Sequence, residues 1–202
     1  MLKRSIIFLI LIIAAAFISG SFAIYNLKSK SSHHEFMVNN GTWRVNPSMD
    51  LKTPKQRALI AIIGLFALRE SEVVYFTAVD DSDGNPLSST HDYILSGSIP
   101  EARYWSYTLY GEDDFLIPNE QKLYGYNGNT IQYMPQDSLN PEIHVSGQLS
   151  YTIEISSEEK ERNWLPSGNN KQLALTLRLY NPSPEVYQNL ETIPLPEITR
   201  IK

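Results

Sequence analysis

The sequence predicts an all-β domain, a jelly-roll-like β-sandwich with one buried helix, preceded by an N-terminal transmembrane or signal helix. Three observations support this prediction. Short apolar and aromatic segments alternate with clusters of Gly, Pro, Asn and Asp, which is the pattern of strands joined by turns. Leucine occupies every second position of residues 173–180, as in a half-buried strand. Residues 6–18 form an unbroken apolar run after two basic residues, which is typical of export signals and anchors.

Composition narrows the classes of function. The chain of 202 residues has room for one ordinary domain and an N-terminal segment. Its formal net charge of -5 argues against a nucleic-acid binder, which would need a basic surface. It contains no cysteine, so disulfides, thiol nucleophiles and thiolate metal sites are excluded.

The N-terminal segment, residues 1–25, allows two interpretations. As a cleaved signal peptide it has a basic start, a short apolar run, and the small residues Ser21 and Ala23 at a cleavage position. As an uncleaved anchor it approaches the roughly 20 apolar residues that span a bilayer. We favour the anchor because Ile24 and Tyr25 prolong the apolar stretch. We therefore predict a protein anchored in the inner membrane with its domain facing the periplasm, or an exported one if the signal is cleaved.

A linker and a single domain are predicted to follow this segment. Residues 26–42 are predicted as the linker, because residues 28–34 are polar and serine-rich. The adjacent His33 and His34 are interpreted as solvated, since neighbouring histidines in a linker share no rigid face that could hold a metal. Residues 43–202 are predicted as the β-sandwich domain.

The one buried helix is predicted at residues 53–70. Thr53 is a suitable N-cap, Pro54 takes the first helical position, and Gln56 completes a capping box. The run over residues 58–68 is apolar nearly all round and too short to cross a bilayer. We expect it to pack against a sheet; a re-entrant or interfacial segment is the alternative.

Strands are predicted from residue 73 onward. The longer ones are expected at residues 73–79, 91–95, 104–110, 148–155 and 173–180. Shorter candidates lie at residues 115–117, 123–126, 130–133 and 142–145. In the longer strands the alternation of apolar and polar side chains predicts one apolar face toward the core and one polar face toward the outside. We expect residues 173–180 to form the closing strand of the domain.

Several segments resemble a known bacterial family. In chain order they are Ala67-Leu68-Arg69-Glu70-Ser71-Glu72, Tyr75-Phe76, Tyr104-Trp105-Ser106-Tyr107-Thr108-Leu109-Tyr110, Phe115-Leu116-Ile117-Pro118-Asn119, Asn163-Trp164-Leu165-Pro166 and Leu177-Arg178-Leu179-Tyr180-Asn181-Pro182. Together they resemble the bacterial domain-of-unknown-function 1214 family, from about Trp43 to the C-terminus. The resemblance implies a jelly-roll-like sandwich, often in a short anchored envelope protein; in larger relatives the domain follows a second one. It implies no particular reaction and no catalytic residues.

The best candidate site is the polar face of two strands, extended by a loop. Its residues are Tyr104, Ser106, Thr108, Tyr110, Arg178 and Tyr180, with Asn163 and Trp164 from the loop before the last long strand. Tyr, Trp and Arg among hydroxyls can stack on sugar rings or clamp a carboxylate. The alternative is that Arg178 pairs with a cross-strand acid such as Glu154, that the tyrosines cover the sheet, and that Trp164 plugs the core.

Metal and catalytic motifs are weak, and no metal or cofactor is predicted. Residues 81–85 carry oxygen ligands in calcium-loop order, but Pro86 takes the place of the required glycine, so an Asp-Gly hairpin turn is preferred. Ser106 lies in mid-strand rather than on a nucleophile elbow, which argues against a Ser-His-Asp site. His91 and His144 lack the close spacing of a cupin-like metal site.

The leading functional prediction is a non-enzymatic, membrane-anchored envelope protein of unknown biochemical role. It would bind a glycan, lipid or envelope-protein partner through one sandwich face, or serve a structural role, without nucleic acid. The alternative is a carbohydrate-active enzyme of the cell envelope on a jelly-roll scaffold, an analogy from fold alone. Two converging carboxylates in a deep pocket would favour the enzyme; a shallow aromatic face would favour binding.

Overall fold

The structure is a computed structural model that describes residues 2–29, 37–45, 54, 57, 68–69, 71–134 and 151–201. The chain divides into two units. The first contains helix α1 (Leu2–Ser29). The second contains all the strands described below and the short helix α3 (Pro184–Gln188). The predicted helix at 53–70 and the pair His33 and His34 lie almost wholly outside the described residues.

Helix α1 is long and apolar enough to cross a membrane. Its stretch Arg4–Tyr25 covers 22 residues, and a bilayer needs about 20. The side chains of this stretch are exposed in the structure. The same length and composition also satisfy the requirements of a signal sequence. The helix extends past residue 25 to Ser29.

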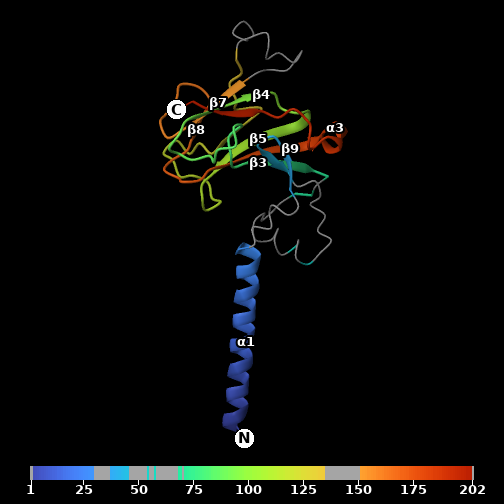
Figure 1. Ribbon diagram of the computed structural model, residues 1–202, viewed down its shortest axis with the longest axis vertical. Coiled ribbons are helices and arrows are strands. Elements are labelled where there is room, and N and C mark those ends of the chain that lie inside the picture. Colours follow the sequence, from blue (N-terminus) through green and yellow to red (C-terminus); the bar gives the residue numbers. More distant parts are fainter. Residues whose placement is uncertain are drawn as a thin grey trace. The chain divides into compact units, whose positions relative to one another are not determined.

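The strands form two sheets. The larger has six antiparallel strands in the order β1 (Val38–Asn40), β2 (Trp43–Val45), β3 (Val73–Ala78), β9 (Ala174–Pro182), β5 (Ala102–Tyr110) and β6 (Gly125–Asn127). The smaller has four, in the order β10 (Glu197–Arg200), β4 (Tyr93–Gly97), β7 (Tyr151–Ser156) and β8 (Trp164–Pro166). Figure 1 shows β3, β9 and β5 in one layer and β4, β7 and β8 in the other. The predicted β-sandwich is confirmed.

The core lies between the two sheets. The four leucines of the alternating stretch, Leu173, Leu175, Leu177 and Leu179, are all buried. They meet the inward residues of the four-stranded sheet, among them Ile153 on β7. Because burial of each such side chain stabilises the fold by about 2 kcal/mol, the alternation fixes which face of β9 points outward.

Strand β9 has a different position from the one predicted. It is a central strand, paired with β3 on one side and β5 on the other, and strand β10 follows it in the chain. A central strand and a closing strand show the same alternation, so the pattern alone could not separate them. The expectation of a closing strand was therefore wrong.

The remaining differences concern short elements. Strands β1, β2 and β8 have three residues each, too few for a period-two pattern to show. Strand β1 begins at Val38, inside the predicted linker. Strand β8 takes up residues 164–166, which were expected to form a loop; it lies at the edge of its sheet, where Pro166 is tolerated. The candidate strand at 142–145 lies outside the described residues.

Candidate functional site

The outer face of the six-stranded sheet brings together six of the eight predicted site residues. We call this surface the tyrosine face; its residues are Tyr75, Tyr104, Ser106, Thr108, Tyr110, Thr176, Arg178 and Tyr180. On β9, Arg178 is flanked by Tyr75 of β3 and Ser106 of β5. Tyr75 was not predicted as a site residue, because only the strand pairing places it beside Arg178.

The Arg178 side chain is held by two hydroxyls and two aromatic rings. Its Nη1 donates to Thr108 Oγ1 at 2.8 Å, and its Nη2 donates to the Tyr110 hydroxyl at 2.5 Å. The guanidinium carbon lies 5.7 Å from the ring centroids of both Tyr75 and Tyr110. Hydroxyl acceptors fix its orientation and the ring faces attract its charge. Arg178 therefore projects from the polar side of the sheet, as predicted.

No carboxylate neutralises Arg178 among the residues that the structure describes. The ion pairs described there join Arg44 to Asp80, Lys160 to Asp92 and Arg200 to Asp81. Glu154, the expected alternative partner, lies on β7 in the four-stranded sheet. It is therefore not a cross-strand neighbour of Arg178. The described groups that contact the cation of the tyrosine face are neutral hydroxyls and aromatic rings.

Two tyrosines form a ring pair next to Arg178 on the same face. Tyr104 of β5 lies opposite Tyr180 of β9. Their ring centroids are 5.6 Å apart and the ring planes are tilted by 51°. Tyr104 is 39% exposed, so part of its ring surface is open to solvent. The pair presents aromatic surface two residues along β9 from the fixed cation, Arg178.

The Tyr75 hydroxyl is neutral at physiological pH. Burial raises the pKa of Tyr75, while a backbone hydrogen bond from Leu68 and the positive charge of Arg178 act in the opposite direction. The Leu68 N–H lies 3.4 Å from the Tyr75 hydroxyl. Tyr75 thus contributes a ring and a neutral hydroxyl, and no negative charge, beside Arg178.

The other two predicted site residues, Asn163 and Trp164, do not lie on the tyrosine face. Trp164 belongs to β8 of the four-stranded sheet and is buried; its Nε1 donates to the Ser156 carbonyl at 3.0 Å. Asn163 is 4% exposed. Its side chain accepts from the Gln132 N–H at 2.7 Å and donates to the carbonyls of Gln132 and Thr152. These contacts give both residues a structural role.

The turn at residues 81–85 is held by hydrogen bonds to its own aspartate. Asp81 Oδ1 accepts from the backbone N–H of Asp83 and of Asn85, at 3.1 Å and 2.8 Å. Asp81 Oδ2 lies 3.2 Å from Arg200 Nη2. Gly84 has a φ of 83°, as a tight turn requires. Within the described ranges, no group of three or more His, Asp or Glu side chains could hold a metal ion.

The serine and histidine weighed for nucleophilic catalysis lie in different parts of the fold. Ser106 is on β5, whereas His91 lies just before β4 and packs edge-on against Tyr93, with ring centroids 6.5 Å apart. Asp92 forms an ion pair with Lys160 at 3.0 Å. His144 lies outside the described residues. The structure therefore does not assemble a Ser-His-Asp arrangement from these residues.

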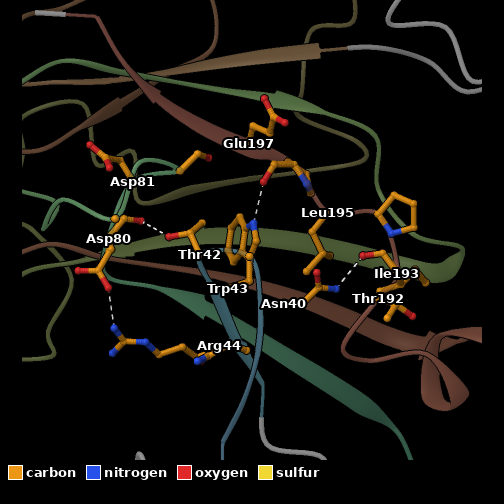
Figure 2. Close-up of a pocket in the computed structure, with 16 residues that line it drawn as sticks. Asn40, Thr42, Trp43, Arg44, Asp80, Asp81, Thr192, Ile193, Leu195 and Glu197 are labelled. Carbon is orange, nitrogen blue, oxygen red and sulfur yellow. Dashed lines mark hydrogen bonds and ion pairs between the residues drawn. The ribbon is translucent and has the colours of Figure 1, made fainter.

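A pocket lies where the β1–β2 hairpin, the segment after β3 and the segment that leads into β10 meet (Figure 2). This pocket has a volume of about 490 Å³ and is lined by residues 39–44, 80–82, Gly84 and residues 192–197. Trp43 Nε1 donates to the Pro196 carbonyl at 2.7 Å, and Arg44 pairs with Asp80 at 2.6 Å. Sequence patterns did not indicate it, because its walls come from segments far apart in the chain.

The fold and the tyrosine face define a class: a two-sheet β-sandwich with an N-terminal apolar helix and a polar aromatic sheet face. The profile of the family described as "Protein of unknown function (DUF1214)" matches residues 72–184, and the chain belongs to this family. The resemblance noted in the sequence is thereby confirmed. No functionally curated protein matches the chain.

One solved structure supports the fold, and a second matches the chain more weakly. The chain is similar to the VPA0106 protein from Vibrio parahaemolyticus, with 26% identity and a TM-score of 0.55 over 75% of this chain and 36% of that one. It also matches a putative uncharacterized protein from Burkholderia cenocepacia, with 14% identity and a TM-score of 0.46 over 89% of this chain and 39% of that one. The chain thus spans little more than a third of the length of either protein.

Proposed function

We propose that this protein is a membrane-anchored envelope protein whose β-sandwich, on the periplasmic side, binds a glycan on the tyrosine face. The observation that supports this function most directly is the ring pair of Tyr104 and Tyr180 beside the fixed cation of Arg178. Rings that stack on the apolar faces of sugars, next to hydroxyls that exchange hydrogen bonds with them, suit a saccharide.

The composition of the face favours a glycan over a lipid or an apolar protein surface. Outside α1, the described residues with large exposed hydrophobic side chains are Leu68, Tyr104, Phe115, Leu116 and Ile201. Only Tyr104 belongs to the tyrosine face, and it carries a hydroxyl. A lipid chain or an apolar protein partner would require a contiguous apolar patch.

The described residues support the alternative, a carbohydrate-active enzyme, less well than they support glycan binding. Glycoside hydrolysis needs two carboxyl groups that converge on the scissile bond. Three carboxylates line the pocket of Figure 2: Asp80 is paired with Arg44, Asp81 is paired with Arg200, and Glu197 is the third. The tyrosine face carries no carboxylate among its defined residues.

Export is tested with a reporter fused after Lys202. A fluorescent protein that matures only in the cytoplasm should stay dark, and alkaline phosphatase should be active, because α1 would carry the domain across the membrane. The control is the same fusion without residues 1–29, which should fluoresce. Bright fluorescence from the full-length fusion would contradict export. Mature chains beginning at Ile24 would show that the segment is a cleaved signal rather than an anchor.

Glycan binding is tested with Tyr104→Ala. Full-length protein in detergent is titrated with hexamers of galacturonate, N-acetylglucosamine and glucose, and binding is followed by calorimetry. We expect at least one hexamer to bind and Tyr104→Ala to weaken it roughly tenfold, since the loss of one stacking ring costs about 1.4 kcal/mol. Phe115→Ala is the matched control, because Phe115 is exposed but lies outside the tyrosine face. An unchanged affinity of Tyr104→Ala would contradict the proposed site.

A further inference from the structure

We infer that the glycan bound by this face is carboxylated, an acidic saccharide such as a uronate, and that Arg178 is the residue that receives its carboxylate. This inference rests on the proposed function and specifies the ligand class. It follows from three properties of Arg178: its unused hydrogen-bond donors, the absence of a counter-ion among the described residues, and the position of the ring pair beside it.

The guanidinium of Arg178 retains donors for a ligand. A guanidinium carries five N–H groups in a fixed planar fork. Thr108 and Tyr110 accept from one N–H on each of the two Nη atoms. Both acceptors are on β5, so they hold the group from one side, and no other described residue accepts from the remaining donors of the fork. A carboxylate takes two parallel N–H bonds from such a fork.

The described surroundings of Arg178 supply orientation but no negative charge. Its hydrogen-bond partners are hydroxyls, and the rings over which it lies belong to Tyr75 and Tyr110. A half-buried cation without an anion is costly, and a ligand that brings the anion removes this cost. The positive charge of the tyrosine face therefore complements an anionic ligand.

The position of the ring pair indicates a saccharide that carries the anion on or next to its ring. Tyr180 follows Arg178 by two residues on the same face of β9, a distance of about 7 Å along the strand. Tyr104 pairs with Tyr180 at that step. This spacing is comparable with the size of a pyranose ring that bears a carboxylate. One sugar ring could thus stack on the tyrosines while its carboxylate reaches Arg178.

Geometry favours a carboxylate over a phosphate. Phosphate sites in proteins usually combine several cations or the amides of a helix N-terminus. The tyrosine face provides a single arginine on a β-strand, and Arg44, also on the outer side of the sheet, is occupied by Asp80. A single planar fork matches one planar carboxylate.

The test compares an acid with its uncharged ester. Full-length protein in detergent is titrated with hexagalacturonate, with its full methyl ester, and with inorganic phosphate. We expect the acid to bind at least tenfold tighter than the ester, and phosphate not to compete at equal concentration. Arg178→Gln should abolish the preference for the acid while the weaker binding of the ester through the tyrosines persists. Arg103→Gln is the matched control, since it removes the same charge from an exposed position on β5.

A second variant keeps the inference testable if Arg178→Gln does not fold. Should Arg178→Gln melt below the assay temperature, Arg178→Lys keeps the charge and loses the planar fork, and it should still reduce the preference for the acid by about tenfold. Equal affinity for acid and ester would overturn the inference and leave glycan binding standing. Preferential binding of phosphate, or of vesicles of phosphatidylglycerol, would also overturn it. Failure of every hexamer to bind would remove the proposed function itself.

Discussion

Replacement of Asn163 by alanine should lower the free energy of unfolding by about 3 kcal/mol. The Asn163 side chain makes three hydrogen bonds to backbone groups, with Gln132 N–H, Gln132 carbonyl and Thr152 carbonyl, at 2.7, 2.7 and 2.8 Å. Alanine leaves those groups without a partner at a site where the asparagine is buried. Each unsatisfied buried group costs about 1–3 kcal/mol. Urea denaturation of the variant and parent measures the difference.

Asn119 supplies a matched control for this prediction. Its side chain also makes three backbone hydrogen bonds, to the Ile117 carbonyl, the Leu123 carbonyl and the Leu123 N–H. Asn119 is only half-buried, so water can replace the lost partners, and Asn119→Ala should cost about 1 kcal/mol. If Asn163→Ala were as stable as the parent but failed to bind glycan, Asn163 would be a ligand residue and its structural assignment here would be wrong.

Alkaline pH should destabilise the fold through two core tyrosines. Tyr107 and Tyr151 are buried and their hydroxyls are 2.8 Å apart. Burial is the main cause that raises the pKa of both tyrosines, and the pKa of Tyr107 lies well above the usual value for a tyrosine. In the unfolded chain both ionise near pH 10, so above that pH the folded state binds more protons than the unfolded state. Stability is therefore complete below about pH 10 and falls as the pH rises further.

The loss should be large enough to measure by denaturation at several pH values. Each tyrosine that keeps its proton only when folded lowers the free energy of unfolding by about 1.4 kcal/mol per pH unit above 10. At pH 11.5 the two together should cost about 4 kcal/mol relative to pH 8. A flat profile up to pH 11.5 would mean that these hydroxyls reach solvent in the folded protein.

Phenylalanine variants separate these two tyrosines from other groups that titrate in alkali. The double variant Tyr107→Phe, Tyr151→Phe removes both partners of one hydrogen bond and should be near the parent in stability at pH 8. Its stability should fall much less between pH 10 and 11.5. The single variant Tyr107→Phe leaves the Tyr151 hydroxyl without its partner, so it should cost about 1–2 kcal/mol at pH 8. A double variant as sensitive to alkali as the parent would exclude this pair as the cause.

The sequence by itself determined the class of fold and the orientation of the long strands. Alternation is a local property: in β9 and β5 successive side chains point to opposite faces, so burial of the leucines around Leu177 directed Arg178 outward. The apolar length of Arg4–Tyr25 likewise identified a segment fit to be an anchor or a signal without any tertiary information. Each prediction depended only on residues close together in the chain.

Only the tertiary structure decided which strands are neighbours, and with them the composition of the site. Tyr75 joins Arg178 because β3 pairs with β9, a contact between residues about a hundred positions apart. Asn163 and Trp164 leave the predicted site because Trp164 begins a three-residue strand of the other sheet and Asn163 directly precedes that strand. Strand pairing depends on long-range packing and on the register of hydrogen bonds, and neither leaves a periodic signal within one strand. The sequence could therefore predict which face of a strand each side chain occupies, whereas only the pairing of strands decided which side chains lie next to one another.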